Sequence, residues 1–186
     1  MKKSSIVLGL LVMTGLFMPF SAYSVDTKNA IQAVSLTVSG SALLAIKTTS
    51  IGLSLSGAAE AGAAIQTVAQ DSTTRLRISS LVDGEAVTRN ISAKIDLQPV
   101  GADLSISVLA PTTDFESGAT VQGAFLSDII LSAASAKNII TGIGTCWSGT
   151  ETDSGYVIKY TYKMQDAAPV VTGTGVIVTY TLSDPT

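Results

Sequence analysis

The stretch Tyr156-Val157-Ile158-Lys159-Tyr160-Thr161-Tyr162 decides the fold class of this chain. Large apolar or aromatic residues occupy every second position of it. Successive side chains of a β-strand point to opposite faces, so this alternation predicts a strand with one face on a core. Tyr156, Ile158, Tyr160 and Tyr162 share that face, although a row of tyrosines also suits a sugar-binding surface.

The same period of two recurs along the chain, in residues 34–38, 51–55, 76–78, 91–97, 104–108 and 176–182. Gly, Ser and Asp separate these runs, and Asp83-Gly84 is the best candidate for a two-residue hairpin turn. No long helical period interrupts the pattern. The sequence therefore predicts an all-β fold, an antiparallel β-sandwich of Greek-key or immunoglobulin-like type, formed by residues 25–186 as a single domain.

Residues 1–24 have the pattern of a cleavable helical signal peptide. Lys2 and Lys3 precede an apolar run that ends at Pro19, and the small residues Ala22 and Ser24 predict cleavage between Ser24 and Val25. The uninterrupted apolar part is shorter than the roughly 18–20 residues that a spanning helix needs. We therefore expect an exported protein, in the periplasm, at the cell surface or outside the cell, that does not span the membrane after cleavage.

Composition excludes several functional classes. The chain contains no His and a single Cys, Cys146. The Ser-His-Asp and Cys-His arrangements are therefore absent, as is an internal disulfide. Because Lys2 and Lys3 fall in the leader, 9 of the 11 basic residues remain against 14 acidic ones, a net charge of −5. That balance argues against a nucleic-acid partner. We expect no catalytic residues, cofactor or metal site. Whether Cys146 is buried or reactive stays open.

Two aromatic residues are candidates for binding. Trp147 is the single Trp and lies in a Gly/Ser/Thr-rich stretch, and Tyr156 begins the aromatic strand. An exposed Trp stacks on sugar rings or anchors a partner protein. The alternative for Trp147 is a side chain folded back over the end of the sandwich, and the alternative for Tyr156 is burial in the core, since large aromatics usually bury most of their area.

Several stretches resemble a group of small exported bacterial proteins of unassigned function. They are Gly142 to Thr150, Gly155-Tyr156, Val178 to Asp184, Glu60-Ala61-Gly62 and the strand at 91–97. This resemblance implies a surface or periplasmic β-domain and supplies no catalytic residue. The chain is also similar to fimbrial (pilus) subunits, which end in an alternating strand with a Tyr, as at Tyr180. Such subunits exchange a terminal strand between neighbours. The present chain lacks their common disulfide.

These observations favour an exported, non-enzymatic structural or adhesive β-domain at the bacterial cell surface, as in a fimbria-like fibre subunit. Protein partners or self-assembly are then expected, with Val34, Leu36 and Val38 as the strand-exchange candidate. The alternative is a carbohydrate-binding module that uses exposed aromatics, with a glycan as the partner.

Overall fold

The structure is a computed structural model that describes residues 34, 35, 37–48, 50–84, 86–112, 115, 122–165 and 175–185. The predicted signal peptide and Leu36 lie outside the described residues. Contacts divide the chain into residues 1–37 and 38–186, and the strands of the described residues all belong to the second unit. The description of the fold below concerns that unit.

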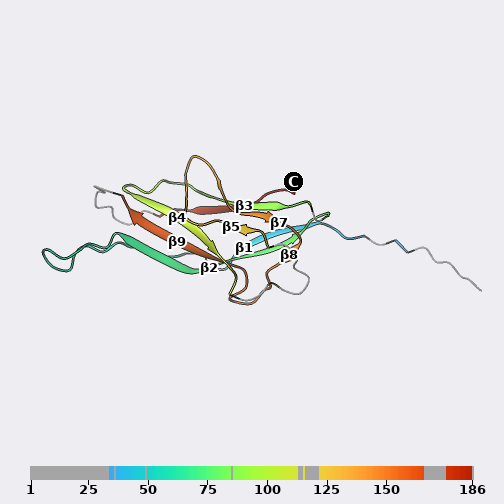
Figure 1. The fold of residues 1–186 in the computed structure, drawn as a ribbon, viewed down its shortest axis with the longest axis horizontal. Helices are drawn as coiled ribbons and strands as arrows, with labels where there is room; N and C mark the ends of the chain where they lie inside the picture. Colours follow the sequence, from blue (N-terminus) through green and yellow to red (C-terminus); the bar gives the residue numbers. More distant parts are fainter. Residues whose placement is uncertain are drawn as a thin grey trace, which may run out of the picture. The chain divides into compact units, whose positions relative to one another are not determined.

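The described strands form two antiparallel sheets (Figure 1). Sheet A has the order β1 (Ser41–Ile46), β2 (Val68–Leu81), β9 (Tyr156–Met164), β4 (Ala102–Leu109) and β6 (Ile129–Ile130), and β8 (Cys146–Trp147) pairs with β2. Sheet B has the order β10 (Val178–Leu182), β3 (Arg89–Ile95), β7 (Lys137–Ile143) and β5 (Ala124–Phe125). The described chain is therefore all-β with two antiparallel sheets, as predicted.

One hydrophobic core lies between the two sheets. The inner strands alternate buried and half-buried residues, and their core-facing side chains include Leu76, Ile78, Ile91, Ile95, Ile106, Val108 and Ile158. Such alternation is what a sheet with one face on a core and one face in solvent requires. At the edge formed by β4, β6 and β5, the segment after β5 closes the gap. Its Leu126 bonds to Val108 of sheet A and to Ile139 of sheet B through the backbone.

Four features differ from the sequence prediction. The described residues of the 34–38 run form no strand. The Asp83-Gly84 turn is present, with Gly84 at a φ of +98°, but it joins β2 in sheet A to β3 in sheet B. The hairpin prediction is therefore wrong. Residues 51–55 form no strand, although Ile51 and Leu53 pack against the core. β2 begins at Val68, earlier than expected, and its pairing with β9 continues to Val68 beyond a register shift between Asp71 and Thr74.

β8 and β9 lie one after the other along the same side of β2. Cys146 and Trp147 pair with Ser80 and Ser79, and β9 resumes the pairing where Tyr156 meets Leu76. Ser148 still bonds to the Ile78 carbonyl oxygen of β2 through its backbone N–H, and the chain then leaves the sheet and returns at Gly155, whose φ is +102°. A Cβ on Gly155 would lie 2.5 Å from the carbonyl oxygen of Leu76, so the return requires glycine.

Candidate functional site

The side of the sandwich bounded by β1 and β10 is the candidate site, and we call it the seam. β1 is the last strand of sheet A on this side and β10 the last strand of sheet B. The two strands contact each other across the sandwich. Each pairs through one edge, β1 with β2 and β10 with β3, so its other edge has no strand partner among the described residues.

The core is incompletely covered along the seam. The core-facing residues of both edge strands pack against the core but stay half-exposed: Leu44 and Ile46 on β1, and Val178, Tyr180 and Leu182 on β10. On the neighbouring strands the equivalent residues are almost fully buried, for example Ile91 at 0% exposure and Ile78 at 3%. A further strand along the seam would cover this apolar surface.

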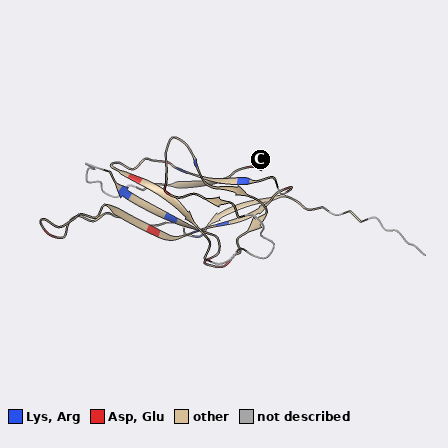
Figure 2. Ribbon diagram, in the orientation of Figure 1, with Lys and Arg blue, Asp and Glu red and all other residues tan. Residues whose placement is uncertain are grey.

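The edges of the seam carry no charge. β1 has the sequence SALLAI and β10 the sequence VTYTL (Figure 2). Natural proteins usually protect a free sheet edge with Lys, Pro, a bulge or a very short strand, because an unprotected edge pairs with other chains. Neither strand carries Lys or Pro, and the pairings of β1 and β10 with their neighbours show no bulge. The edges are thus suited to pairing.

The strand-exchange candidate lies just before β1 in the sequence. Val34 and Val38 are 68% and 82% exposed, and the described residues of 34–40 belong to no strand. Leu36, the third candidate, lies outside the described residues. Val34 and Val38 are thus apolar side chains that stay largely exposed to solvent.

Trp147 lies on the outer face of sheet A. Its neighbour Cys146 is fully buried in the core, and successive strand residues point to opposite faces. Trp147 is half-buried and is aligned with Ser79, which is aligned in turn with Leu43 on β1. Leu43 is 66% exposed. The two large apolar side chains thus flank a small serine on one face of the sheet.

Tyr156 lies in the core. It is fully buried, its ring packs against Phe115 and Phe125 with centroids 5.1 and 5.6 Å away, and its hydroxyl donates to the carbonyl oxygen of Gln122 at 2.7 Å. A buried ring has no free face for stacking on a sugar. Tyr156 is therefore a core residue, as are Ile158 and Tyr160 on the same strand.

Cys146 is also buried. Removal of the thiol from water raises its pKa from 9.0 to about 11, and the nearby Tyr156 hydroxyl offsets part of that shift by hydrogen bonding. Thiolate is the nucleophilic form of cysteine, and the raised pKa keeps the Cys146 thiol protonated at neutral pH. Of the two alternatives left open by the sequence, buried or reactive, the structure supports burial of Cys146.

In comparisons with known proteins, no protein-family model, curated protein or solved structure matches the chain. Within the described part of the chain, no helix has the length and apolar character for crossing a membrane. The same residues contain no group of three or more His, Cys, Asp or Glu side chains placed to hold a metal ion.

The sequence pattern suggested Val34, Leu36 and Val38 as a strand-exchange candidate, which stays a prediction, and it did not predict the seam. A signal was present, because residues 29–46 and 175–183 contain no charged side chain. Pattern alone could not show that these two uncharged segments border the same side of the sandwich. That juxtaposition arises from β1 and β10 belonging to different sheets whose edges meet.

Proposed function

We propose that this protein is an exported, non-enzymatic structural subunit of a bacterial surface fibre, and that its copies join by β-strand addition. The observation that carries the proposal is the seam, where two uncharged edges and a half-exposed row of apolar side chains lie together. An extended segment that pairs with a free sheet edge gains main-chain hydrogen bonds, and pockets for alternate side chains give specificity.

The strand order supports a specific form of this sandwich. In immunoglobulin-type folds, strands A, B, E and D form one sheet and strands C, F and G the other. If β1 to β4 are taken as A to D, β9 as E and β10 as F, the order β1-β2-β9-β4 reproduces A-B-E-D. The pairing of β10 with β3 reproduces F beside C. Strands β5 to β8 then form an insertion between D and E.

By this correspondence, the free edge of β10 is the position of strand G. No described strand occupies it. An immunoglobulin-like sandwich without strand G exposes its core between strands A and F, which correspond to β1 and β10. The half-exposed residues Leu44, Tyr180 and Leu182 lie at that position. We infer that the missing strand comes from another copy of the chain.

The segment containing Val34, Leu36 and Val38 is the proposed donor. Its apolar residues alternate with Ser35 and Thr37, so one face of an added strand would fill the seam and the other would face solvent. Five strand residues extend over roughly 16 Å, the length of the five-residue strand β10. The segment is uncharged, like both edges that it would join.

The test is the assembly state of the exported protein and of a donor variant. We expect purified wild-type protein to form polymers in size-exclusion chromatography with light scattering, and fibres by electron microscopy. The double variant Val34→Asp/Val38→Asp would place two charges in the apolar seam and should remain monomeric. Val100→Asp is the matched control, because Val100 is 61% exposed and lies on the connection between β3 and β4.

A peptide of residues 33–39 provides a second measurement. Added to the monomeric variant, the peptide should raise its melting temperature, because a ligand that binds only the folded state stabilises it. A wild-type protein that stays monomeric, or polymers that persist in the double variant, would contradict the proposal.

A further inference from the structure

A shallow hollow lies on the outer face of sheet A, on the side away from β1. Its volume is about 580 Å³, and the lining residues come from β9, β4 and the β6 region: Asp103, Ser105, Asp128, Ile130, Thr161 and Lys163. The strand-addition proposal uses the opposite side of the sandwich, at β1 and β10. The hollow would therefore stay open to solvent in an assembled fibre.

Strand register explains why this face is hollowed. Ser105 of β4 is aligned with Thr161 of β9 on one side and with Ile130 of β6 on the other. In the next row, Asp103 is aligned with Lys163. The small Ser105 and Thr161 side chains form the floor, and longer side chains stand around them. Met164 and Gln165, at the end of β9, also line the hollow.

Two carboxylates of the hollow are held in place by neighbours. Gln165 Nε2 donates to Asp103 Oδ1 at 2.9 Å. Ser107 Oγ donates to Asp128 Oδ1 at 3.0 Å and accepts a bond from the Asp128 backbone N–H at 2.9 Å. These bonds engage one oxygen of each carboxylate, so the second oxygen can accept a bond from a ligand.

Asp128 also has an uncommon backbone conformation. Its φ is +54°, and it is the one non-glycine residue with a positive φ among the described residues. Asp and Asn tolerate this left-handed region better than other residues because their side chains bond locally. The Asp128 side chain bonds to Ser107 on β4, which is distant in the sequence. Asp128 immediately precedes β6 and lines the hollow together with Ile130.

We propose that the hollow binds a neutral saccharide unit. Sugar hydroxyls donate to carboxylates and accept from an ammonium group, and the hollow offers Asp103, Asp128 and Lys163 for these contacts. Ile130 is 53% exposed and gives an apolar surface for the C–H face of a sugar ring. The carboxylates of Asp103 and Asp128 outnumber the ammonium group of Lys163, so binding of a negatively charged sugar is disfavoured by repulsion between like charges. Carboxylates that are already oriented lose little freedom on binding.

The experiment screens the fluorescently labelled protein on an array of immobilised neutral and acidic glycans and titrates the strongest neutral hit by calorimetry. Asp128→Asn keeps a residue suited to positive φ while it removes the charge, and should weaken binding at least ~10-fold. Ser105→Leu fills the floor and should abolish binding. Asp153→Asn is the matched control, since it removes an exposed charge in the 148–155 loop, outside the hollow. Thermal unfolding of each variant verifies that it is folded.

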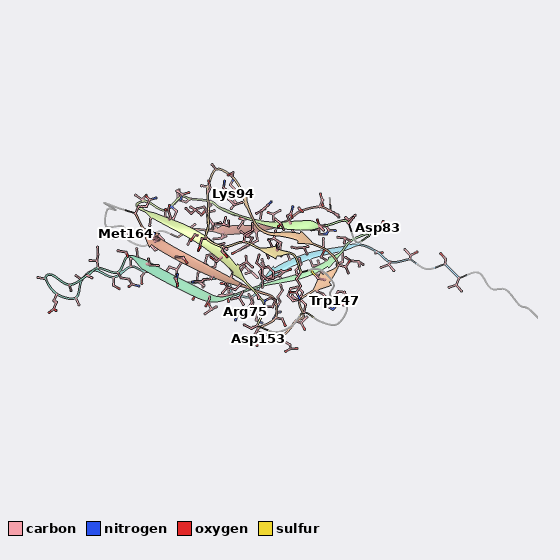
Figure 3. The ribbon with its side chains drawn as sticks, viewed as in Figure 1. Arg75, Asp83, Lys94, Trp147, Asp153 and Met164 are labelled. Atoms are coloured by element: carbon pink, nitrogen blue, oxygen red, sulfur yellow. The ribbon has the colours of Figure 1, made fainter. Side chains whose placement is uncertain are left out.

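The variant Trp147→Ala distinguishes glycan binding in the hollow from stacking of a sugar on Trp147. Trp147 and Met164, which lines the hollow, lie towards opposite ends of sheet A (Figure 3). Neutral hits that weaken in the two hollow variants and persist in Trp147→Ala and Asp153→Asn support the proposal. Absence of glycan hits, hits confined to acidic glycans, or hits lost in Trp147→Ala and kept in the hollow variants would overturn it. The monomeric donor variant should bind as wild type does, so the result is independent of fibre assembly.

Discussion

The hydroxyl oxygens of Tyr160 and Tyr180 lie 2.5 Å apart and join the two sheets of the sandwich. Tyr160 belongs to β9 of sheet A and Tyr180 to β10 of sheet B. Burial raises the pKa of both hydroxyls, so both keep their protons at neutral pH. The contact thus holds the edge strand β10, one side of the seam, against a central strand of the opposite sheet.

Tyr180→Phe should reduce the free energy of unfolding by about 1–2 kcal/mol, since it leaves the buried Tyr160 hydroxyl without its partner. The double variant Tyr160→Phe/Tyr180→Phe should cost less than the sum of the two single variants, because it removes both polar groups. Urea unfolding of the four proteins measures this coupling. Strictly additive effects would show that the two hydroxyls do not interact.

Alkaline pH should destabilise the protein. Burial is the main cause that raises the folded-state pKa of Tyr156, Tyr160 and Tyr180 above 10.0, and that of Cys146 from 9.0 to about 11. Below pH 9 both folded and unfolded states hold these protons, so stability should not vary with them. Above pH 9 the unfolded chain loses protons that the folded state keeps, and the free energy of unfolding falls. Chemical denaturation at pH 7, 9 and 10.5 tests the sign.

The Cys146 thiol should resist modification in the folded protein. It is fully buried, and its raised pKa keeps it protonated at pH 7.5. Ellman's reagent should react slowly with native protein and at once in guanidinium, with the native rate following global or local opening. A fast native reaction, at the rate of a free thiol peptide, would contradict the burial of this residue.

Gly155→Ala should destabilise the fold by at least ~2 kcal/mol, because the residue has a φ of +102° and a Cβ would overlap the Leu76 carbonyl. Gly57→Ala is the control, since no atom lies within 4 Å of its added Cβ and its φ is not positive. We expect the control to change stability by less than ~0.5 kcal/mol. Melting temperatures of the two variants compare the effects.

Much of the fold was predictable because strand alternation is a local property. β3, β4, β9 and β10 occur where the period of two predicted strands, since each places one apolar row on the core. The 51–55 segment shows the limit of the method. It has the same pattern, and Ile51 and Leu53 do pack against the core, but its backbone pairs with none of the described strands. Apolar periodicity reports burial, whereas a strand also requires a hydrogen-bonding neighbour.

The candidate sites were less predictable, because each depends on residues far apart in the sequence. Tyr156 and Trp147 belong to neighbouring aromatic stretches, yet one is fully buried and the other lies on the outer face of sheet A. Asp103 and Asp128 carry no motif, and the hollow exists because β6 aligns Ile130 with Ser105.

The sequence by itself determined that the described chain is all-β and antiparallel, because alternation and turn residues act through neighbours along the backbone. It also determined which segments carry no charge. Tertiary structure alone decided that β1 and β10 meet at one side of the sandwich and that their core-facing residues stay half-exposed. The physical reason is that β-pairing joins distant segments, and the exposed area of a side chain depends on whether a further strand covers it.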